Sequence, residues 1–235
     1  MFNFSHLKTE TLANGATVFT DLEQGTPDWH QVRLGILTAS EVGLLLVKGK
    51  RPDGLGAGAL TAGLRIAGEI YRINGGYDAT PESWSNVYTE RGHTLEEEWR
   101  GEYEFITDEF ITQVGFVRLD SIRFGGSPDA LVAKNGVWEC KSHKPEILIP
   151  MLLETGFPEA HKPQCLGNLI TTDREYCDIT AGFPGLPKLS RRLYREDCKE
   201  EESIIKEKLS ALNEYVDDIL KQLKAGDPVY AMAAE

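Results

Sequence analysis

The sequence predicts an α/β protein with a mixed central β-sheet flanked by helices. Two β-prone runs, 130–133 and 137–142, lie on either side of a Lys-Asn-Gly turn, which is typical of a β-hairpin. Residues 110–126 alternate apolar and polar side chains, as strands do. Residues 198–224 repeat apolar side chains at helical spacing, which predicts a long amphipathic helix.

The composition suits one globular domain over residues 1–235. Of the 235 residues, 41% are hydrophobic and 26% are charged, which is enough to bury a sizeable core. No apolar run approaches the roughly 20 residues of a membrane span, and the N-terminus does not resemble a secretory leader, so we expect no membrane partner. The four scattered cysteines favour reduced thiols in a cytoplasm over a disulfide framework.

The net charge of −12 is informative about partners. Contacts to nucleic-acid phosphates need Lys and Arg, so this charge weighs against broad non-specific DNA binding. It weighs less against an enzyme that presents basic groups only inside a narrow cleft or channel.

The N-terminal part is predicted to start with an arm over about residues 1–25, which includes a short strand at 16–19. Thr26 is a candidate N-cap and Pro27 a candidate first helical residue, so a short helix is expected to follow and to end at Gly35. A second helix is predicted to start at residues 38–40.

The later elements follow from the same patterns. Helices are predicted over residues 60–73, 82–104, 147–153, 160–172 and 198–224, and strands over 110–126, 176–181 and 193–194. The pair Gly75-Gly76 is expected to stop the first of these helices. The basic, glycine-rich stretch 48–58 is either a solvated connector or a loop that touches the DNA backbone.

The predicted hairpin brings together residues that can do chemistry. Glu139 and Lys141 are two apart on one strand and share a face, and Asp129 precedes the partner strand. Two carboxylates can hold a hard cation such as Mg²⁺, and a lysine beside them can act on a water or stabilise negative charge. Taken alone, a Glu-x-Lys pair is most often a solvated ion pair.

A second candidate lies near the N-terminus. Arg33 and the Ser40 hydroxyl could converge at a helix N-terminus, which is a natural phosphate site. The alternative is a pair of amphipathic helices with a solvated Arg33.

Two sequence motifs carry a resemblance to a known family. Pro128-Asp129 followed by Glu139-Cys140-Lys141 resembles the core of the PD-(D/E)xK nuclease superfamily. The segment 28–42, DWHQVRLGILTASEV, is similar to the first motif of the phage lambda-type exonucleases, also called YqaJ-type viral recombinases. Both motifs occur in the family's order and at its spacing, which makes the pair much more specific than either one.

The resemblance implies roles for individual residues. Asp129, Glu139 and the Cys140 main-chain carbonyl would hold a first metal, and Glu96, four residues after Gly92, would add a further carboxylate. The implied cofactor is Mg²⁺, as two ions, for which Mn²⁺ could substitute.

Further residues are implied to act on the substrate. Lys141 would orient or deprotonate the attacking water, and its pKa is expected to fall beside cations. Gln164 would position Lys141 and the water, although without the family it reads as a surface residue of a helix. Arg33, Ser40 and Ser127 would grip the 5′-terminal phosphate. Many relatives carry an aromatic residue three positions before the glutamine, where this chain has His161.

The implied function is a Mg²⁺-dependent 5′-to-3′ exonuclease that acts on linear double-stranded DNA. It would release 5′-mononucleotides and leave 3′ single strands for phage-type recombination by strand annealing. The resemblance also implies a trimeric ring, a single-strand annealing protein as partner, and a location in the cytoplasm of a bacterial host. Two alternatives remain open: a PD-(D/E)xK endonuclease, and a non-catalytic module that binds DNA ends.

Overall fold

The strands form two five-stranded mixed sheets. The computed structural model describes residues 4–79 and 87–226, and within this range the side chains of residues 87–94 are not described. Sheet A has the order β1 (Thr9–Thr11), β2 (Thr17–Phe19), β5 (Phe116–Leu119), β6 (Phe124–Gly126) and β3 (Leu37–Thr38). Sheet B has the order β10 (Leu189–Tyr194), β9 (Tyr176–Gly182), β8 (Gly136–Ser142), β7 (Ala130–Val132) and β4 (Ile111–Thr112).

Helices cover these sheets. They are α1 (Pro27–Val32), α2 (Gly43–Leu46), α3 (Ala57–Asn74), α4 (Val87–Thr107), α5 (Pro145–Leu153), α6 (Lys162–Thr172) and α7 (Lys199–Gly226), and short 3₁₀ turns span Ala39–Glu41, Asp120–Ile122 and Arg195–Cys198. The predicted α/β class with a mixed sheet flanked by helices is confirmed. The strands divide between two sheets because the chain leaves sheet A after Gly126 and enters sheet B at Ala130.

The predicted hairpin is present as β7 and β8. The two strands pair antiparallel, with Ala130 opposite Trp138 and Val132 opposite Gly136. Ala133 adopts a left-handed conformation (φ 42°) at the start of the turn. A side chain at position 136 would require the Tyr176 ring to move, because its Cβ would lie 2.4 Å from that ring. The sequence at the turn therefore fits the observed register.

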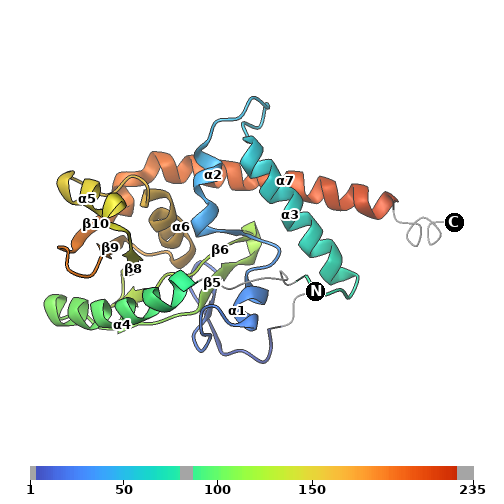
Figure 1. Cartoon of the computed structure of the whole chain (residues 1–235). Helices are drawn as coiled ribbons and strands as arrows, with labels where there is room; N and C mark the ends of the chain where they lie inside the picture. Colours follow the sequence, from blue (N-terminus) through green and yellow to red (C-terminus); the bar gives the residue numbers. More distant parts are fainter. Residues whose placement is uncertain (1–3, 80–86, 227–235) are drawn as a thin grey trace.

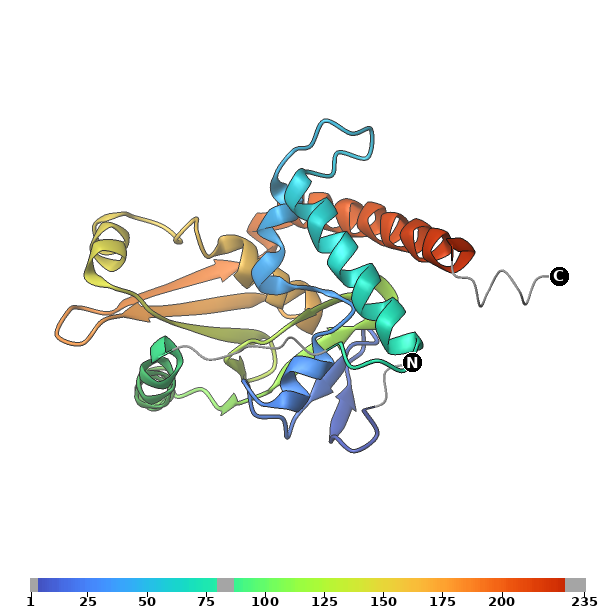
Figure 2. The ribbon, with the colours of Figure 1, turned by 45° about the vertical axis from the view of Figure 1, so that its right-hand side comes forward.

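Strand β8 has two differently used faces. Its odd-numbered residues face α6: Val137 is part of the core that includes this helix, and Glu139 bonds to side chains of α6. Trp138 packs on the other face against Trp99 and Tyr103 of α4. Figures 1 and 2 show α4 and α6 on opposite sides of this sheet. The alternation of the strand therefore presents Glu139 and Lys141 on the face that α6 covers.

Helices α3 and α7 pack together beside the sheets (Figures 1 and 2). The buried face of α7 consists of Ile205, Leu209, Leu212 and Val216. The close approach depends on Gly63 of α3, where a Cβ would lie 2.8 Å from the Tyr215 ring. This long helix was predicted over 198–224 and is confirmed.

Some local predictions need correction. The helix predicted to start at residues 38–40 is instead a two-residue strand followed by a 3₁₀ turn and the four-residue helix α2. The short strand predicted at 16–19 is confirmed as β2, and the rest of the predicted arm adds β1; β1 pairs with β2, and β2 pairs with β5 within sheet A. Within residues 4–79 and 87–226, no helix is both long and apolar enough to cross a membrane.

Candidate active site

One cavity collects most of the residues singled out in the sequence. It has a volume of about 180 Å³ and is lined by the catalytic candidates Asp129, Glu139, Lys141 and Gln164 and by the phosphate-binding candidates Arg33, Ser40 and Ser127. The first group comes from sheet B and α6, and the second from the first motif and the link between the sheets. The fold therefore places two motifs that are about a hundred residues apart around the same space.

Glu139 is the most constrained residue of the site. Its side chain is 1% exposed, and three donors surround its carboxylate. Oε1 accepts from Lys141 Nζ at 2.6 Å and from Gln164 Nε2 at 2.5 Å, and Oε2 accepts from Asn168 Nδ2 at 2.9 Å. A buried carboxylate is tolerated when it is paired and hydrogen-bonded in this way. One oxygen, Oε2, keeps more capacity to accept a further bond than the other.

Asp129 is held beside Glu139 by the hairpin. Its Oδ2 accepts a hydrogen bond from the main-chain N–H of Cys140 at 2.6 Å. Burial and then the negative charges of Glu139 and Glu96 raise its pKa well above the usual range, against opposing effects of Lys141 and the hydrogen bond. The protein's own groups thus disfavour the ionised form of Asp129, which a nearby cation would favour.

Lys141 is protonated when only the protein's own groups act on it. Burial lowers its pKa, but Glu139 and Asp129 outweigh burial and raise the pKa well above its usual value. The fall that we expect for this pKa depends on cations beside Lys141, which are not among these groups. A role as a base would need divalent cations there to lower the pKa.

The Cys140 side chain lies on the Trp138 face of the strand, where it packs against the Trp99 and Trp138 cluster. Burial, and then the charge of Asp129, raises the pKa of this thiol. The thiol stays protonated at neutral pH, which fits the expectation that Cys140 would contribute its main-chain carbonyl and not its sulfur.

Glu96 lies on α4 and faces Asp129 from a second cavity. This cavity has a volume of about 640 Å³, and Asp129, Glu96 and Glu97 are among its lining residues. The charge of Glu96 acts on the pKa values of both Asp129 and Cys140. Asp129 lines both cavities, so it marks the point where they meet. Glu98, on the same helix, is exposed and lines neither cavity.

The position of the Arg33 guanidinium favours the binding of an anion. It follows the last residue of α1, and its guanidinium lies 3.8 Å from the centre of the Trp29 ring. Within the described part of the chain it makes no hydrogen bond or ion pair, and burial lowers its pKa. A guanidinium that is stacked on an aromatic ring and keeps its donors unused suits phosphate recognition.

The two serines lie near Arg33 in different settings. Ser127 Oγ accepts a 2.9 Å hydrogen bond from Trp29 Nε1, which ties it to the residue that stacks on Arg33. Ser40 is exposed, and its Oγ lies 3.0 Å from Thr38 Oγ1. Because Ser40 belongs to a three-residue 3₁₀ turn, the expected helix N-terminus contributes little here, and side-chain groups provide the donors.

The structure adds three residues that the sequence did not single out for a role: Asn168, Trp29 and Thr38, all of which line the cavity. The i, i+4 spacing was the available signal for Asn168, since it puts two amides on one helical face.

His161, which stands where many relatives carry an aromatic residue, pairs with another histidine. Its Nε2 lies 2.8 Å from His143 Nε2, and the two rings stack with their centres 4.9 Å apart. Burial, then His143 and Lys141, lower the pKa of His161 to about 4. The pair is therefore neutral at physiological pH.

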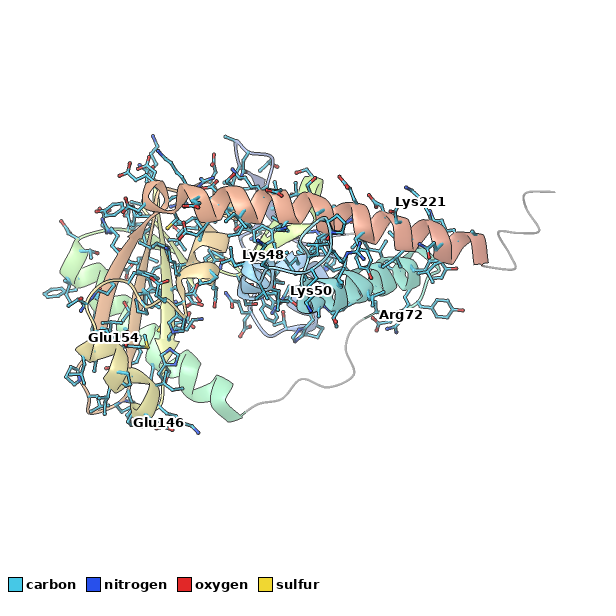
Figure 3. All side chains as sticks on the ribbon, turned by 90° about the horizontal axis from the view of Figure 1, so that it is seen from above. Lys48, Lys50, Arg72, Glu146, Glu154 and Lys221 are labelled. Carbon is cyan, nitrogen blue, oxygen red and sulfur yellow. The ribbon has the colours of Figure 1, made fainter. Side chains whose placement is uncertain are left out.

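Charge is unevenly distributed over the surface. Lys48 and Lys50 lie close together in the segment before α3, and Arg72 lies in the last turn of that helix, whereas Glu146 on α5 and Glu154 just after it lie at the other end of the molecule (Figure 3). Lys48 and Lys50 are exposed. A locally basic region on an acidic protein is compatible with a nucleic-acid partner that approaches from this side.

The donors at the site fit a divalent cation by their chemistry. Asp129, Glu139 and Glu96 supply carboxylate oxygens, and Lys141 neutralises only one of these charges. In the described ranges, however, no three His, Cys, Asp or Glu side chains are already grouped as a complete ligand set. Three carboxylates beside a single lysine leave an excess of negative charge, which favours a cation.

The hairpin with Pro128-Asp129 just before its first strand and Glu139 and Lys141 on its second defines a nuclease of the PD-(D/E)xK class. Residues 28–175 match the model of the YqaJ-like viral recombinase domain, which covers more than half of the chain. The chain belongs to this family.

Solved structures give the same result. An alkaline exonuclease, LHK-Exo, from Laribacter hongkongensis is 26% identical, with a TM-score of 0.68 over 85% of this chain and 96% of that one. The same protein in complex with dAMP gives a TM-score of 0.69 at the same identity and coverage. A phage-related exonuclease from Haemophilus somnus 129PT shares the fold at 16% identity, with a TM-score of 0.56 over 80% and 96% of the two chains. No curated protein sequence matches the chain.

Proposed function

We propose that this phage-type nuclease is a Mg²⁺-dependent 5′-to-3′ exonuclease of linear double-stranded DNA. It releases 5′-mononucleotides and leaves 3′ single-stranded tails for recombination by strand annealing. The observation that carries the proposal is the single cavity shared by Asp129, Glu139 and Lys141 with Arg33 and Ser127. A hydrolytic centre beside a phosphate grip favours attack near a strand end.

The polarity follows from the phosphate grip. Arg33 has unused donors and lies with Ser127 and Ser40 on the cavity wall. A 5′-terminal monophosphate is a dianion that only one end of each strand carries, so a guanidinium that binds it would select that end. The complex of the similar LHK-Exo with dAMP supports a mononucleotide as product.

The hydrolytic residues have distinct tasks. Lys141 is positioned by Glu139 to orient the attacking water and, in its deprotonated form, to accept a proton from it. Gln164 holds the same oxygen of Glu139 and thereby fixes the neighbourhood of Lys141. Both tasks depend on the hydrogen bonds that Glu139 accepts from Lys141 and Gln164.

Asp129, Glu139, the Cys140 carbonyl and Glu96 would hold the metal, and we propose two Mg²⁺ ions that Mn²⁺ can replace. When bound, divalent cations stabilise negative charge on the attacking and leaving oxygens of a phosphodiester. Asp129 and Glu96 face each other across the larger cavity, which offers room for a second ion.

Assembly and location form a further part of the proposal. A trimeric ring with the DNA in a central channel would reconcile the net charge of −12 with DNA binding, because the channel could be basic while the outside is acidic. A single-strand annealing protein would receive the 3′ tail, and the cytoplasm of a bacterial host would be the site of action.

Digestion of matched DNA substrates tests the proposal. Linear duplex with one 5′-phosphorylated and one unphosphorylated end is incubated with Mg²⁺, beside the closed-circular form. We expect only the linear DNA to shorten, faster from the phosphorylated end, with release of mononucleotides. Cleavage of the circle would instead identify an endonuclease. Inertness toward both forms with Mg²⁺ and Mn²⁺ would identify a non-catalytic module that binds DNA ends.

A further inference from the structure

Helix α3 lies outside both sequence motifs. Two of its side chains nevertheless form hydrogen bonds with residues of the first motif, 28–42. Glu69 Oε2 accepts a hydrogen bond from the main-chain N–H of Gly35 at 2.7 Å. Arg65, one turn earlier, donates Nη1 to the two oxygens of Glu69 at 3.0 and 3.2 Å. The phosphate-binding segment is therefore fastened to α3 by an ordered ion pair.

Arg65 reaches a second acid within the motif itself. Its Nη2 donates to both oxygens of Glu41, at 3.0 and 3.1 Å. Glu41 Oε2 also accepts from the N–H of Thr38 at 3.1 Å and from its hydroxyl at 2.8 Å. Thr38 lines the cavity together with Arg33, so the network ends at the wall of the candidate phosphate site.

Two charged residues of this network, Glu41 and Arg65, have opposite effects on the pKa of Arg33. After burial, which lowers the pKa of Arg33, the next influences are Glu41, which raises it, and Arg65, which lowers it. Glu41 is thus an anion close enough to attract the Arg33 guanidinium. It would compete there with a phosphate unless another cation held it.

We propose that Arg65 is a positioning residue for 5′-phosphate recognition. It engages Glu41 and thereby keeps Arg33 available to the terminal phosphate of the substrate. The inference rests on the proposed role of Arg33 and adds a determinant of end specificity on α3. Glu69 holds Arg65 from the other side and keeps the Gly35 backbone in place.

The test compares charge-removing variants: Arg65→Gln, Glu41→Gln and the double variant. The readouts are the ratio of digestion rates from 5′-phosphorylated and unphosphorylated ends with Mg²⁺, and the ratio of affinities for the same two duplexes in EDTA. In Arg65→Gln, Glu41 turns to Arg33, and both ratios should fall about two- to fivefold, the range of a partly exposed ion pair.

The sign of the other variants separates an electrostatic role from a merely structural one. Glutamine at position 41 can still accept from Thr38 but carries no charge, so Glu41→Gln should keep or increase the preference for phosphorylated ends. The double variant should return towards the wild type. Arg195→Gln is the matched control, because Arg195 also bridges two acids, Asp173 and Glu202, and lines neither cavity of the site.

Two outcomes would overturn the inference while the phosphate role of Arg33 stands: an unchanged ratio in Arg65→Gln, or a double variant with a lower ratio than Arg65→Gln. A wild-type protein that treats phosphorylated and unphosphorylated ends alike would overturn the phosphate role itself. Thermal unfolding of each variant shows whether a loss of the ratio accompanies a loss of the fold.

Discussion

Asn168 donates its amide to Oε2 of Glu139 over 2.9 Å, from a position one helical turn after Gln164, which binds the other oxygen. Asn168 is fully buried, and its Oδ1 has no hydrogen-bond partner in the described structure. Buried acceptors of this kind are costly to leave unpaired, and this one belongs to a residue that lines the site cavity. The arrangement indicates that Asn168 serves the site more than the stability of α6.

The first prediction concerns this residue. Asn168→Ala should lower nuclease activity by about 10- to 100-fold, the effect seen when a residue that orients a metal ligand is lost. Initial rates and the Mg²⁺ concentration for half-maximal rate measure the effect. Asn213→Ala is the control. The side chain of Asn213 on α7 is likewise hydrogen-bonded, to a main-chain carbonyl and to an arginine, but it lies outside the cavity. Equal rates for both variants would contradict the role.

Lys141→Ala should remove nearly all hydrolysis and leave DNA binding in place. The substitution deletes the group that we propose to act on water, and general acid–base groups contribute about 10²- to 10⁴-fold. Single-turnover digestion with Mg²⁺ measures the rate, and a binding assay in EDTA measures retention of the duplex. Full activity of the variant would remove the core of the proposed function.

Gly126→Ala should disturb the site because the added methyl group would clash with the side chain of Asn168. A Cβ at this position would lie 2.3 Å from Asn168 Oδ1, so the Asn168 side chain would have to move away from its position beside Glu139. We expect a loss of activity and a lower melting temperature. Gly68→Ala is the matched control: it lies inside α3 with nothing within 4 Å of a Cβ, and it should stabilise the protein by about 0.5–1 kcal/mol. Normal activity of Gly126→Ala would show that the glycine is not required there.

Glu202 predicts a dependence of stability on acid. Hydrogen bonds from Arg195, opposed by burial, lower its pKa from 4.5 to about 2. Because the folded pKa is depressed, the stabilisation is fully present above pH about 4.5 and is lost as pH falls towards 2. Glu202→Gln should therefore cost roughly 1–3 kcal/mol at pH 7 and progressively less at lower pH. Urea unfolding of both proteins from pH 2 to 7 measures the difference, which must not grow in acid.

The basic region at Lys48 and Lys50 predicts a salt effect. Replacing both by Glu should weaken duplex binding and make its dependence on salt concentration less steep, because fewer counterions are released. Lys221→Glu is a control with an exposed lysine on α7 (Figure 3). An unchanged salt slope would assign the basic loop to a solvated connector.

The parts of the fold set by local pattern could be predicted from the sequence. The hairpin, α3, α6 and α7 follow from turn residues, apolar periodicity and glycine stops, and their observed bounds agree with the expected ones to within a few residues. The division of the strands between two sheets could not be predicted. It depends on which strands pair across the chain, such as β2 with β5, and periodicity carries no information about partners.

The site was predicted in its acidic and basic residues but not in the groups that hold them. Asp129, Glu139 and Lys141 stand in a recognisable spacing, and the structure brings them together with Arg33. The contacts of Trp29 to Ser127 and of Arg65 to Glu41 join residues that are 98 and 24 positions apart. Trp29 and Arg65 have ordinary positions on amphipathic helices, so only tertiary structure reveals their partners.

Residues 127–129, which link the two sheets, limit the distance between two parts of the proposed site. Ser127, in the proposed phosphate site, and Asp129, in the proposed hydrolytic centre, are joined by Pro128 alone, and two residues of chain span at most about 7 Å. Successive nucleotides of one strand advance by about 3.4 Å along the duplex axis, so this span is on the scale of one or two of them. The short chain between Ser127 and Asp129 would thus limit the distance between the bound 5′-phosphate and the phosphodiester bond that is hydrolysed. Fragment size would then be a fixed property of the backbone, independent of how fast the enzyme moves along its substrate.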